Sequence, residues 1–160
     1  MTVYITNLAS HEPLPEGFTN LLEEMAQSIL EQHGLGSGEL GLILTDDAHL
    51  RKLNCSYRGL DSSTDVLSFS MLDRPGGRPL VEQGGGLLIG DIYISVDRAR
   101  VQALERSHPF LQEILQLAIH GLLHLLGFSH DQPNSSRVMA EREREIFIHW
   151  SSKIGWGQTR

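Results

Sequence analysis

The sequence has little of several features that mark whole classes of protein. A single cysteine, Cys55, excludes an internal disulfide, which fits a reducing cytoplasm. No apolar run approaches the roughly 18 residues of a membrane-spanning helix, and the first residues lack the pattern of a secretory signal. A G-x-x-x-x-G-K phosphate-binding loop is also missing, so we expect no nucleotide cofactor. These absences predict a cytoplasmic protein that does not contact membranes.

Basic residues are also few. Lysine and arginine number 13 against 20 aspartates and glutamates, which gives a net charge of −7. Strong nonspecific binding to nucleic acid depends on neutralising phosphates with cationic side chains. A chain of this charge that acts on RNA therefore needs a local basic groove, or a partner that supplies the affinity.

The length of 160 residues and the 40% apolar content suit one domain. Apolar periodicity predicts four strands and five helices. We expect an α+β fold, in which helices cover a small mixed sheet and residues 151–160 form a frayed tail. The strands are expected at 3–5, 39–44, 66–70 and 87–95, and the helices at 16–33, from 45, from 95, from 109 and from 134 or 135.

Further expectations concern the segments between and within these elements. Residues 55–65 are rich in polar groups and residues 72–85 in glycine, so both are expected to be loops, the second one mobile. The helix that begins after residue 95 is expected to turn three apolar residues to the core: Ala99, Val101 and Leu104.

Three histidines stand in an otherwise apolar stretch. His120 and His124 are four residues apart, so a helix puts both imidazoles on one face, with Cβ atoms about 5–6 Å apart. Gly127 can adopt the left-handed conformation that ends a helix, after which the chain can bring His130 to the same point. Three imidazoles leave one tetrahedral position open, as in a catalytic zinc site. We therefore predict one Zn²⁺ per chain, bound by His120, His124 and His130.

The ordinary alternative is that these histidines are core residues. A lone histidine in an apolar helix usually satisfies one hydrogen bond inside the core. Three polar rings buried without partners would cost several kcal/mol, whereas one cation satisfies all three. The helix is apolar on almost all sides, which is typical of a buried helix, so we expect the metal in the middle of the molecule, at the base of a cleft.

The residue after the first histidine also carries information. Zinc peptidases of the H-E-x-x-H type have a glutamate there that acts as general base, and this chain has Gly121. The missing glutamate argues against ordinary peptide hydrolysis. The helical H-x-x-x-H with a third histidine still keeps a zinc metallopeptidase-like hydrolase as an alternative.

Three stretches resemble the YbeY endoribonucleases, bacterial proteins of rRNA maturation. Residues 120–130 are similar to H-G-x-L-H-L-x-G-(Tyr or Phe)-Asp-H, residues 54–69 to N-x-x-Y-R-x-x-D-x-x-T-D-V-L-S-F, and residues 90–95 to G-D-I-x-I-S. Ser129 departs from the pattern, because aspartate is commonest there. The resemblance implies a single metal-dependent hydrolase domain over residues 1–160. It also implies a zinc-dependent endoribonuclease that cuts single-stranded RNA in rRNA maturation and ribosome quality control, with rRNA and the small ribosomal subunit as partners.

Arg58 is the candidate catalytic residue outside the histidine stretch. From composition alone, a salt bridge to Asp61 or Asp65 is the simpler interpretation. The resemblance implies instead a catalytic or phosphate-binding arginine at this position. The planar guanidinium suits a phosphate that gains charge during reaction.

Other functions and roles stay open at this stage. The metal could stabilise the fold of a ribosome-associated factor, or serve a hydrolase of small substrates. Asp131 and Ser129 are near enough in sequence to orient His130 or a water molecule, but spacing does not assign the general base.

Overall fold

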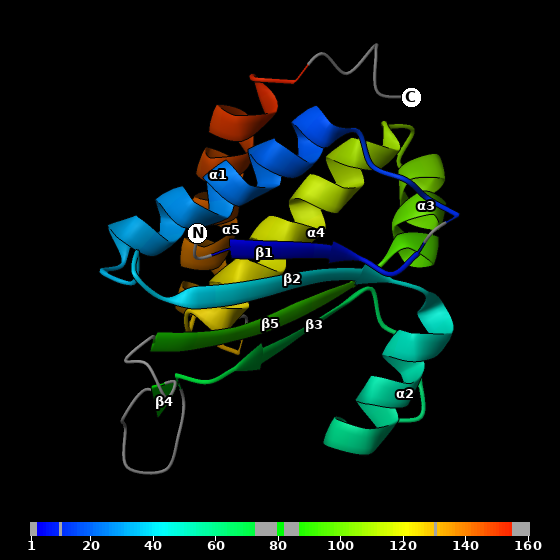
Figure 1. The fold of residues 1–160 in the computed structure, drawn as a ribbon, viewed down its shortest axis with the longest axis horizontal. Coiled ribbons are helices and arrows are strands. Elements are labelled where there is room, and N and C mark those ends of the chain that lie inside the picture. Colours follow the sequence, from blue (N-terminus) through cyan, green and yellow to red (C-terminus); the bar gives the residue numbers. More distant parts are fainter. Residues whose placement is uncertain (1–2, 10, 73–79, 82–86, 130, 155–160) are drawn as a thin grey trace.

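The computed structural model describes residues 3–9, 11–72, 80–81, 87–129 and 131–154 (Figure 1). Its sheet has the strand order β1-β2-β5-β3, with the short β4 pairing elsewhere along β5. β1 and β2 are parallel to each other and β2 is parallel to β5, whereas β3 and β4 are antiparallel to β5. The strands are β1 Val3–Asn7, β2 Glu39–Thr45, β3 Val66–Ser70, β4 Leu80–Val81 and β5 Leu87–Ser95.

The helices lie on both sides of this mixed sheet, so the predicted α+β class is confirmed. Figure 1 shows α1, α4 and α5 on one side, with α3 at the end of that layer, and α2 on the opposite side. In the part of the chain that the structure describes, no helix is both long and apolar enough to span a bilayer. The helices are α1 Glu16–Gln32, α2 Asp47–Arg58, α3 Val96–Glu105, α4 Phe110–Leu125 and α5 Pro133–Ser151.

The core lies between the sheet and the layer of α1, α4 and α5. Alternate residues of the central strands are almost fully buried, as expected for a sheet with one covered face: Leu40, Leu42, Leu44, Ile92 and Ile94. The intervening residues Gly41, Ile43, Asp91 and Tyr93 are only half-buried. The face of the sheet that carries α2 is therefore more open than the face that carries α4.

α2 is longer than the sequence predicts. Residues 55–58, expected to open a loop, form its last turn, so Arg58 is the final helical residue. The Asp46 carboxylate caps the start by accepting a hydrogen bond from the His49 amide, and Gly59 ends the helix in the left-handed conformation with φ 69°. Only the shorter stretch from Gly59 to Asp65 remains a loop.

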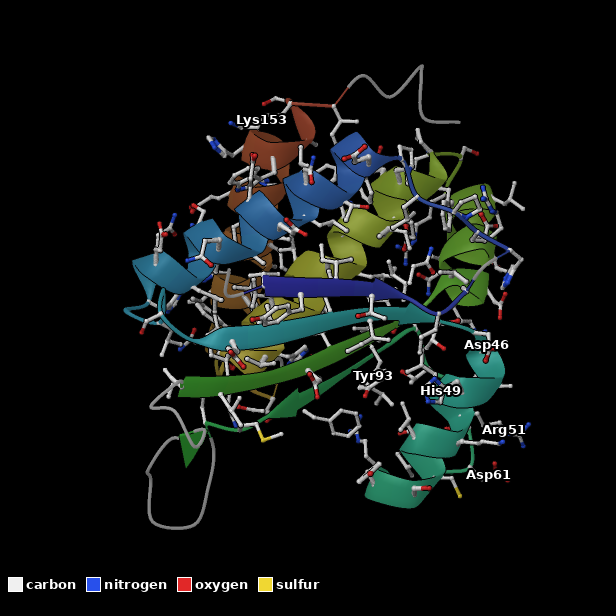
Figure 2. The ribbon with its side chains drawn as sticks, viewed as in Figure 1. Asp46, His49, Arg51, Asp61, Tyr93 and Lys153 are labelled. Atoms are coloured by element: carbon white, nitrogen blue, oxygen red, sulfur yellow. The ribbon has the colours of Figure 1, made fainter. Side chains whose placement is uncertain are left out.

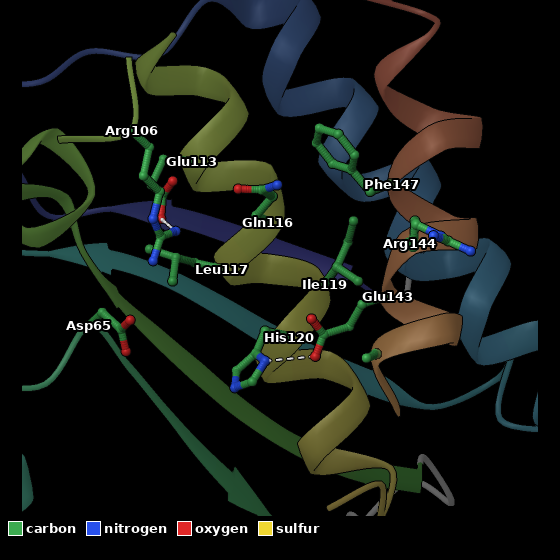
Figure 3. A pocket seen from close by; sticks show the side chains of 11 residues that line it. Asp65, Arg106, Glu113, Gln116, Leu117, Ile119, His120, Glu143, Arg144 and Phe147 are labelled. Carbon is green, nitrogen blue, oxygen red and sulfur yellow. Dashed lines mark hydrogen bonds and ion pairs between the residues drawn. The ribbon is translucent and has the colours of Figure 1, made fainter. Parts of the chain in front are cut away.

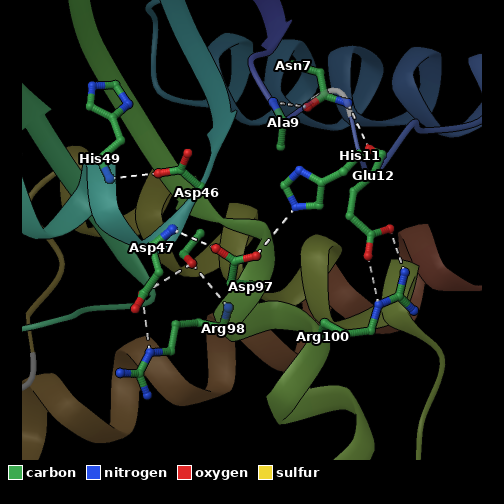
Figure 4. A network of polar contacts seen from close by, with 11 residues as sticks. Asn7, Ala9, His11, Glu12, Asp46, Asp47, His49, Asp97, Arg98 and Arg100 are labelled. Carbon is green, nitrogen blue, oxygen red and sulfur yellow. Dashed lines mark hydrogen bonds and ion pairs between the residues drawn. The ribbon is translucent and has the colours of Figure 1, made fainter.

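A polar network joins the beginnings of α2 and α3 (Figure 4). The Ser95 hydroxyl accepts a hydrogen bond from the Arg98 amide and so caps α3, as predicted. The Asp97 carboxylate accepts a hydrogen bond of 2.8 Å from the backbone amide of Asp47, the first residue of α2. These contacts fix the position of the first turn of α2 relative to α3. They thereby help to set the orientation of the helix whose last residue is Arg58.

Two further expectations need correction. In α3, Val101 and Leu104 are 46% and 75% exposed, while Ala99 and Ala103 are buried. The buried side of α3 therefore includes its alanines rather than these larger apolar residues. Within the expected loop at 72–85, β4 pairs with β5, and the rest of that expectation lies outside the described residues.

The C-terminal helix also begins earlier than expected. Gln132 is the residue that precedes α5, and its side chain and that of Ser135 form a capping box. The predicted frayed tail overlaps the helix at Ser151 and otherwise falls mostly outside the described residues.

Candidate metal centre

The accessible surface of α4 is reduced to one polar stripe. Twelve of its 16 residues are buried, and the four that remain are Gln112, Gln116, His120 and His124. They follow one another at intervals of four, so they form a single line along the helix. The histidines occupy the C-terminal half of this line, and their ring centroids lie 4.5 Å apart. The predicted pairing of two imidazoles on one helical face is therefore present.

The first of these histidines is held by a carboxylate from α5. His120 Nδ1 lies 2.8 Å from Glu143 Oε1 (Figure 3), and the side chains of both residues are about 30% exposed, at 31% and 29%. The hydrogen bond to Glu143 raises the pKa of the His120 imidazole, while burial of the ring opposes that rise. The negative charges of Glu143 and Asp65 raise the same pKa further.

A pocket of about 430 Å³ opens beside His120. Figure 3 shows Asp65, from the loop before β3, on one side of it and Glu143, from α5, on the other. The Asp65 carboxylate accepts a hydrogen bond of 3.1 Å from the Gln102 amide. Glu113, fully buried in the pocket wall, accepts a hydrogen bond from the guanidinium of Arg106. The pocket lining thus mixes both charges.

The end of α4 follows the prediction closely. Gly127 has φ 102°, and the amides of Gly127 and Phe128 donate hydrogen bonds to the carbonyls of His124 and Leu123. This pair of bonds is a Schellman motif, which turns the chain sharply after a helix. His130, the third predicted ligand, lies outside the described residues. On either side of it, the Ser129 hydroxyl accepts a hydrogen bond of 3.4 Å from the Asp131 amide.

The location of the histidines corrects the expected depth of the site. His124 is exposed and His120 is only half-buried, so the pair lies at the surface rather than in the middle of the molecule. The reason is the polar stripe, because the buried sides of α4 are apolar apart from Glu113 and its one accessible line holds the histidines. Among the described residues (3–9, 11–72, 80–81, 87–129 and 131–154), no group of three His, Cys, Asp or Glu side chains is arranged to hold a metal ion. A three-histidine site would need His130.

Gly121 is enclosed by the sheet. A Cβ atom there would lie 2.7 Å from Ile92 Cγ2 and 3.0 Å from Val66 Cγ2, and the Gly121 carbonyl accepts a hydrogen bond of 2.7 Å from the Ser68 hydroxyl. The position that carries the general base in H-E-x-x-H peptidases therefore faces β3 and β5. It has no room for a glutamate, and a side chain there would point away from the histidines.

Arg58 lies at the end of α2, on the side of the sheet opposite to α4. Its neighbour Tyr57 packs edge-on against Phe69, with ring centroids 5.3 Å apart, and Phe69 contacts Tyr93 in turn. Figure 2 shows Tyr93 beside His49, at the start of α2, where the rings are 5.9 Å apart. This series of rings anchors α2 on the open face of the sheet and so fixes the base of Arg58.

The salt bridge considered for Arg58 is absent among the described residues. Asp61 pairs instead with Arg51, at 2.8 Å (Figure 2), and Asp65 is held by Gln102. Arg58 is exposed, and no hydrogen bond or ion pair to its guanidinium is found in the described part of the chain. The loop after Arg58 is held independently, because the buried Asn54 amide donates to the Ser62 carbonyl at 3.0 Å.

Comparison with known proteins gives a consistent family. A family model described as Endoribonuclease YbeY matches residues 4–151. The Endoribonuclease YbeY of Pelotomaculum thermopropionicum is 40% identical over 147 residues, which cover 91% of this chain and 95% of that protein. The chain belongs to the endoribonuclease YbeY family. Another member, Endoribonuclease YbeY of Desulforamulus reducens, is 39% identical over 147 residues with the same coverage of both chains.

A solved structure has a similar fold. A protein from Thermotoga maritima, known from its solution structure, superposes with a TM-score of 0.63 and 26% identity, covering 94% of this chain and 90% of that one. The range matched by the YbeY model includes Arg58 and all three predicted histidine ligands.

Sequence reasoning missed Glu143, although a signal was present. Glu143 follows the buried Met139 by four residues and precedes the buried Ile146 by three, so it lies on the core-facing side of α5. An acidic residue in such a position is unusual unless it has a partner. That partner is 23 residues away in sequence, on another helix.

Proposed function

We propose that this protein is a zinc-dependent endoribonuclease that cuts single-stranded RNA in rRNA maturation and ribosome quality control. The observation that carries the proposal is the pair of adjacent imidazoles at the end of the polar stripe, one of them oriented by a carboxylate, in a chain of the YbeY family. A cytoplasmic location and association with the small ribosomal subunit belong to the same proposal.

The residues present fit a zinc ion. Imidazole nitrogen is a preferred zinc ligand, and the bond from His120 Nδ1 to a carboxylate is the arrangement that metal-binding histidines commonly adopt. His120, His124 and His130 would hold the ion. Bound zinc supplies a Lewis acid that lowers the pKa of water to about 7 and polarises phosphoryl oxygens.

Arg58 would act on the substrate phosphate. Its guanidinium is exposed at the end of α2 and can pair with two phosphate oxygens at once. A cation fixed beside the reacting phosphorus stabilises the charge that develops in the transition state. The aromatic contacts of Tyr57 hold this end of α2, which limits the freedom of Arg58 without occupying its donors.

The acidic composition bears on how RNA is bound. With a net charge of −7 and a pocket lined by both charges, the protein gains little from general phosphate attraction. We infer that a ribosomal partner supplies part of the affinity for rRNA. Cleavage of free RNA is accordingly expected to be slower than cleavage on the particle.

A zinc peptidase is the weaker candidate, because Gly121 faces the sheet and leaves no room for the required glutamate. The decisive experiment compares wild type with His120→Ala for metal content, cleavage of single-stranded RNA and cleavage of casein. Gln112→Ala is the matched control, since it lies on the same stripe about two turns away. We expect His120→Ala to lose RNA cleavage while Gln112→Ala keeps it.

Other outcomes would overturn the proposal. Equal RNA cleavage by all three proteins would mean a contaminating ribonuclease. Casein cleavage by wild type would favour the peptidase, and zinc binding without cleavage of any RNA would favour a hydrolase of small substrates. If His124→Ala unfolds the protein while Arg58→Ala keeps full function in cells, the metal is structural.

A further inference from the structure

We propose that Glu143 is a positioning residue, which holds the His120 imidazole in the orientation required to bind the metal. This inference rests on the proposed function, because it assumes that His120 is a ligand. It concerns a residue of α5, a helix that contributes none of the predicted site residues.

The hydrogen bond between these residues selects one tautomer of His120. A carboxylate accepts and does not donate when ionised, so the proton of the neutral ring lies on Nδ1, which is 2.8 Å from Glu143 Oε1. Nε2 then carries the lone pair that a metal would take. The bond also fixes the rotation of the ring about its side-chain torsions, beside the ring of His124.

The packing of α5 keeps the Glu143 side chain directed towards His120. Met139, Ile146 and Trp150 are buried on the side of α5 that faces the core, and Glu143 lies between the first two. α5 therefore cannot rotate to expose Glu143 without exposing this apolar stripe. The neighbouring acids Glu141 and Glu145 lie on the exposed side of the same helix.

The partial burial of Glu143 needs a compensating contact. Only 29% of its side chain is exposed, and withdrawing a carboxylate from water is unfavourable unless it is paired. The imidazole of His120 provides that pairing. A carboxylate hydrogen-bonded to a metal-binding histidine also increases the basicity of the ring, and loss of such a partner typically costs about 10–100-fold in metal affinity.

The test measures zinc affinity in Glu143→Ala and Glu143→Gln by competition with a coloured chelator. Glu141→Gln is the matched control, because it makes the same charge change on the exposed side of α5. The visible absorption of the Co²⁺-substituted proteins reports the coordination geometry. The melting temperature of each metal-free protein reports folding separately.

We expect Glu143→Ala to lower zinc affinity by about 10–100-fold and to change the Co²⁺ spectrum, with a metal-free melting temperature close to that of wild type. Glu143→Gln should lose less zinc affinity, because its side-chain amide oxygen can still accept the hydrogen bond from His120 Nδ1. Glu141→Gln should match wild type in all three measurements.

Two results would overturn the inference and leave the proposed function intact. Unchanged zinc affinity and spectrum in Glu143→Ala would show that His120 needs no such support. A loss as large as that of His120→Ala would make Glu143 a ligand rather than a positioning residue. If wild type itself binds no zinc, the proposed function fails, and the inference fails with it.

Discussion

Two polar side chains on the α2 side of the sheet, Arg58 and Asp91, differ from the polar groups on the side covered by α4. On the face covered by α4, the polar groups pair with one another: His120 with Glu143, and Ser68 with the Gly121 carbonyl. On the face that carries α2, no hydrogen bond or ion pair to the side chains of Arg58 or Asp91 is found within the described residues. Burial raises the pKa of the Asp91 carboxyl, as expected when no cation compensates it.

The difference separates two kinds of functional group. A side chain paired within the fold has a defined orientation before any ligand arrives, which suits a metal ligand. A side chain left without a partner in the fold has its donors or its charge available to a molecule from outside. Substitutions at Arg58 and at Asp91 test this distinction, and a substitution at Gly121 tests the packing of α4 that holds the histidine pair in place.

The largest effect is expected at Arg58. Because no hydrogen bond or ion pair to its guanidinium is found among the described residues, Arg58→Ala should leave the melting temperature unchanged. Removing a charge that stabilises the transition state typically costs about 10²–10³-fold in kcat, and we expect a loss of that size in single-stranded RNA cleavage. Arg58→Lys should retain only part of the wild-type cleavage activity, since an ammonium cannot pair with two phosphate oxygens at once.

The matched control is Arg51→Ala, in the same helix. Arg51 pairs with the exposed Asp61, and exposed ion pairs contribute little to stability. We expect RNA cleavage close to that of wild type. If Arg51→Ala and Arg58→Ala lose RNA cleavage equally, the total positive charge on α2 determines the activity. The proposal that Arg58 has a specific role in cleavage is then wrong.

The second effect concerns the sheet-facing side of α4. In Gly121→Ala the new methyl group would approach Ile92 Cγ2 to 2.7 Å. Overpacking of this kind costs about 1–3 kcal/mol, while alanine gains about 0.8–1.0 kcal/mol over glycine in a helix. We expect a net loss of about 1 kcal/mol in the free energy of unfolding, measured by urea denaturation.

Gly17→Ala is the control for this change. It is also a helical glycine, in α1, but a Cβ atom there meets no atom within 4 Å. It should therefore be neutral or slightly stabilising. A Gly121→Ala protein as stable as Gly17→Ala would mean that α4 can move away from the sheet, and that the peptidase glutamate could be accommodated after all.

The features predicted correctly from sequence have local causes. The end of α4 at Gly127 and the cap of α3 at Ser95 each depend on one residue and its immediate neighbours. The histidine pair is similarly local, because a spacing of four on a helix sets its geometry. The strand positions at 39–44, 66–70 and 87–95 likewise follow from local apolar segments, whereas their order in the sheet was not predicted.

The features that sequence reasoning missed have distant causes. Val101 and Leu104 are the larger apolar residues of α3, but they are exposed, and the smaller Ala99 and Ala103 are buried instead. The last turn of α2 contains no apolar pattern, and its helical state follows from the Gly59 cap and the ring contact of Tyr57. Glu143 gains its role only when α5 folds back onto α4.

The smallest effect is expected at Asp91. Its carboxylate lies over Gly41, where a Cβ atom would come within 2.3 Å of Oδ1. Because its pKa is raised in the folded protein, the native state binds the proton more tightly than the unfolded state. Stability therefore falls as pH rises from the unfolded value of 3.8 through the raised folded value, and the penalty persists at neutral pH.

Asp91→Asn should remove this penalty. We expect the variant to melt slightly higher than wild type at pH 7. The gain should disappear below the unfolded pKa of 3.8, where the Asp91 carboxyl of the wild type is protonated in both the folded and the unfolded state. Asp61→Asn should behave in the opposite sense, because the hydrogen bond and charge of Arg51 lower the pKa of Asp61. Melting curves of the three proteins between pH 3 and pH 7 test both signs. If Asp91→Asn is destabilised at pH 7, the Asp91 carboxylate has a favourable partner in the folded protein, and the contrast between the two faces does not hold at this residue.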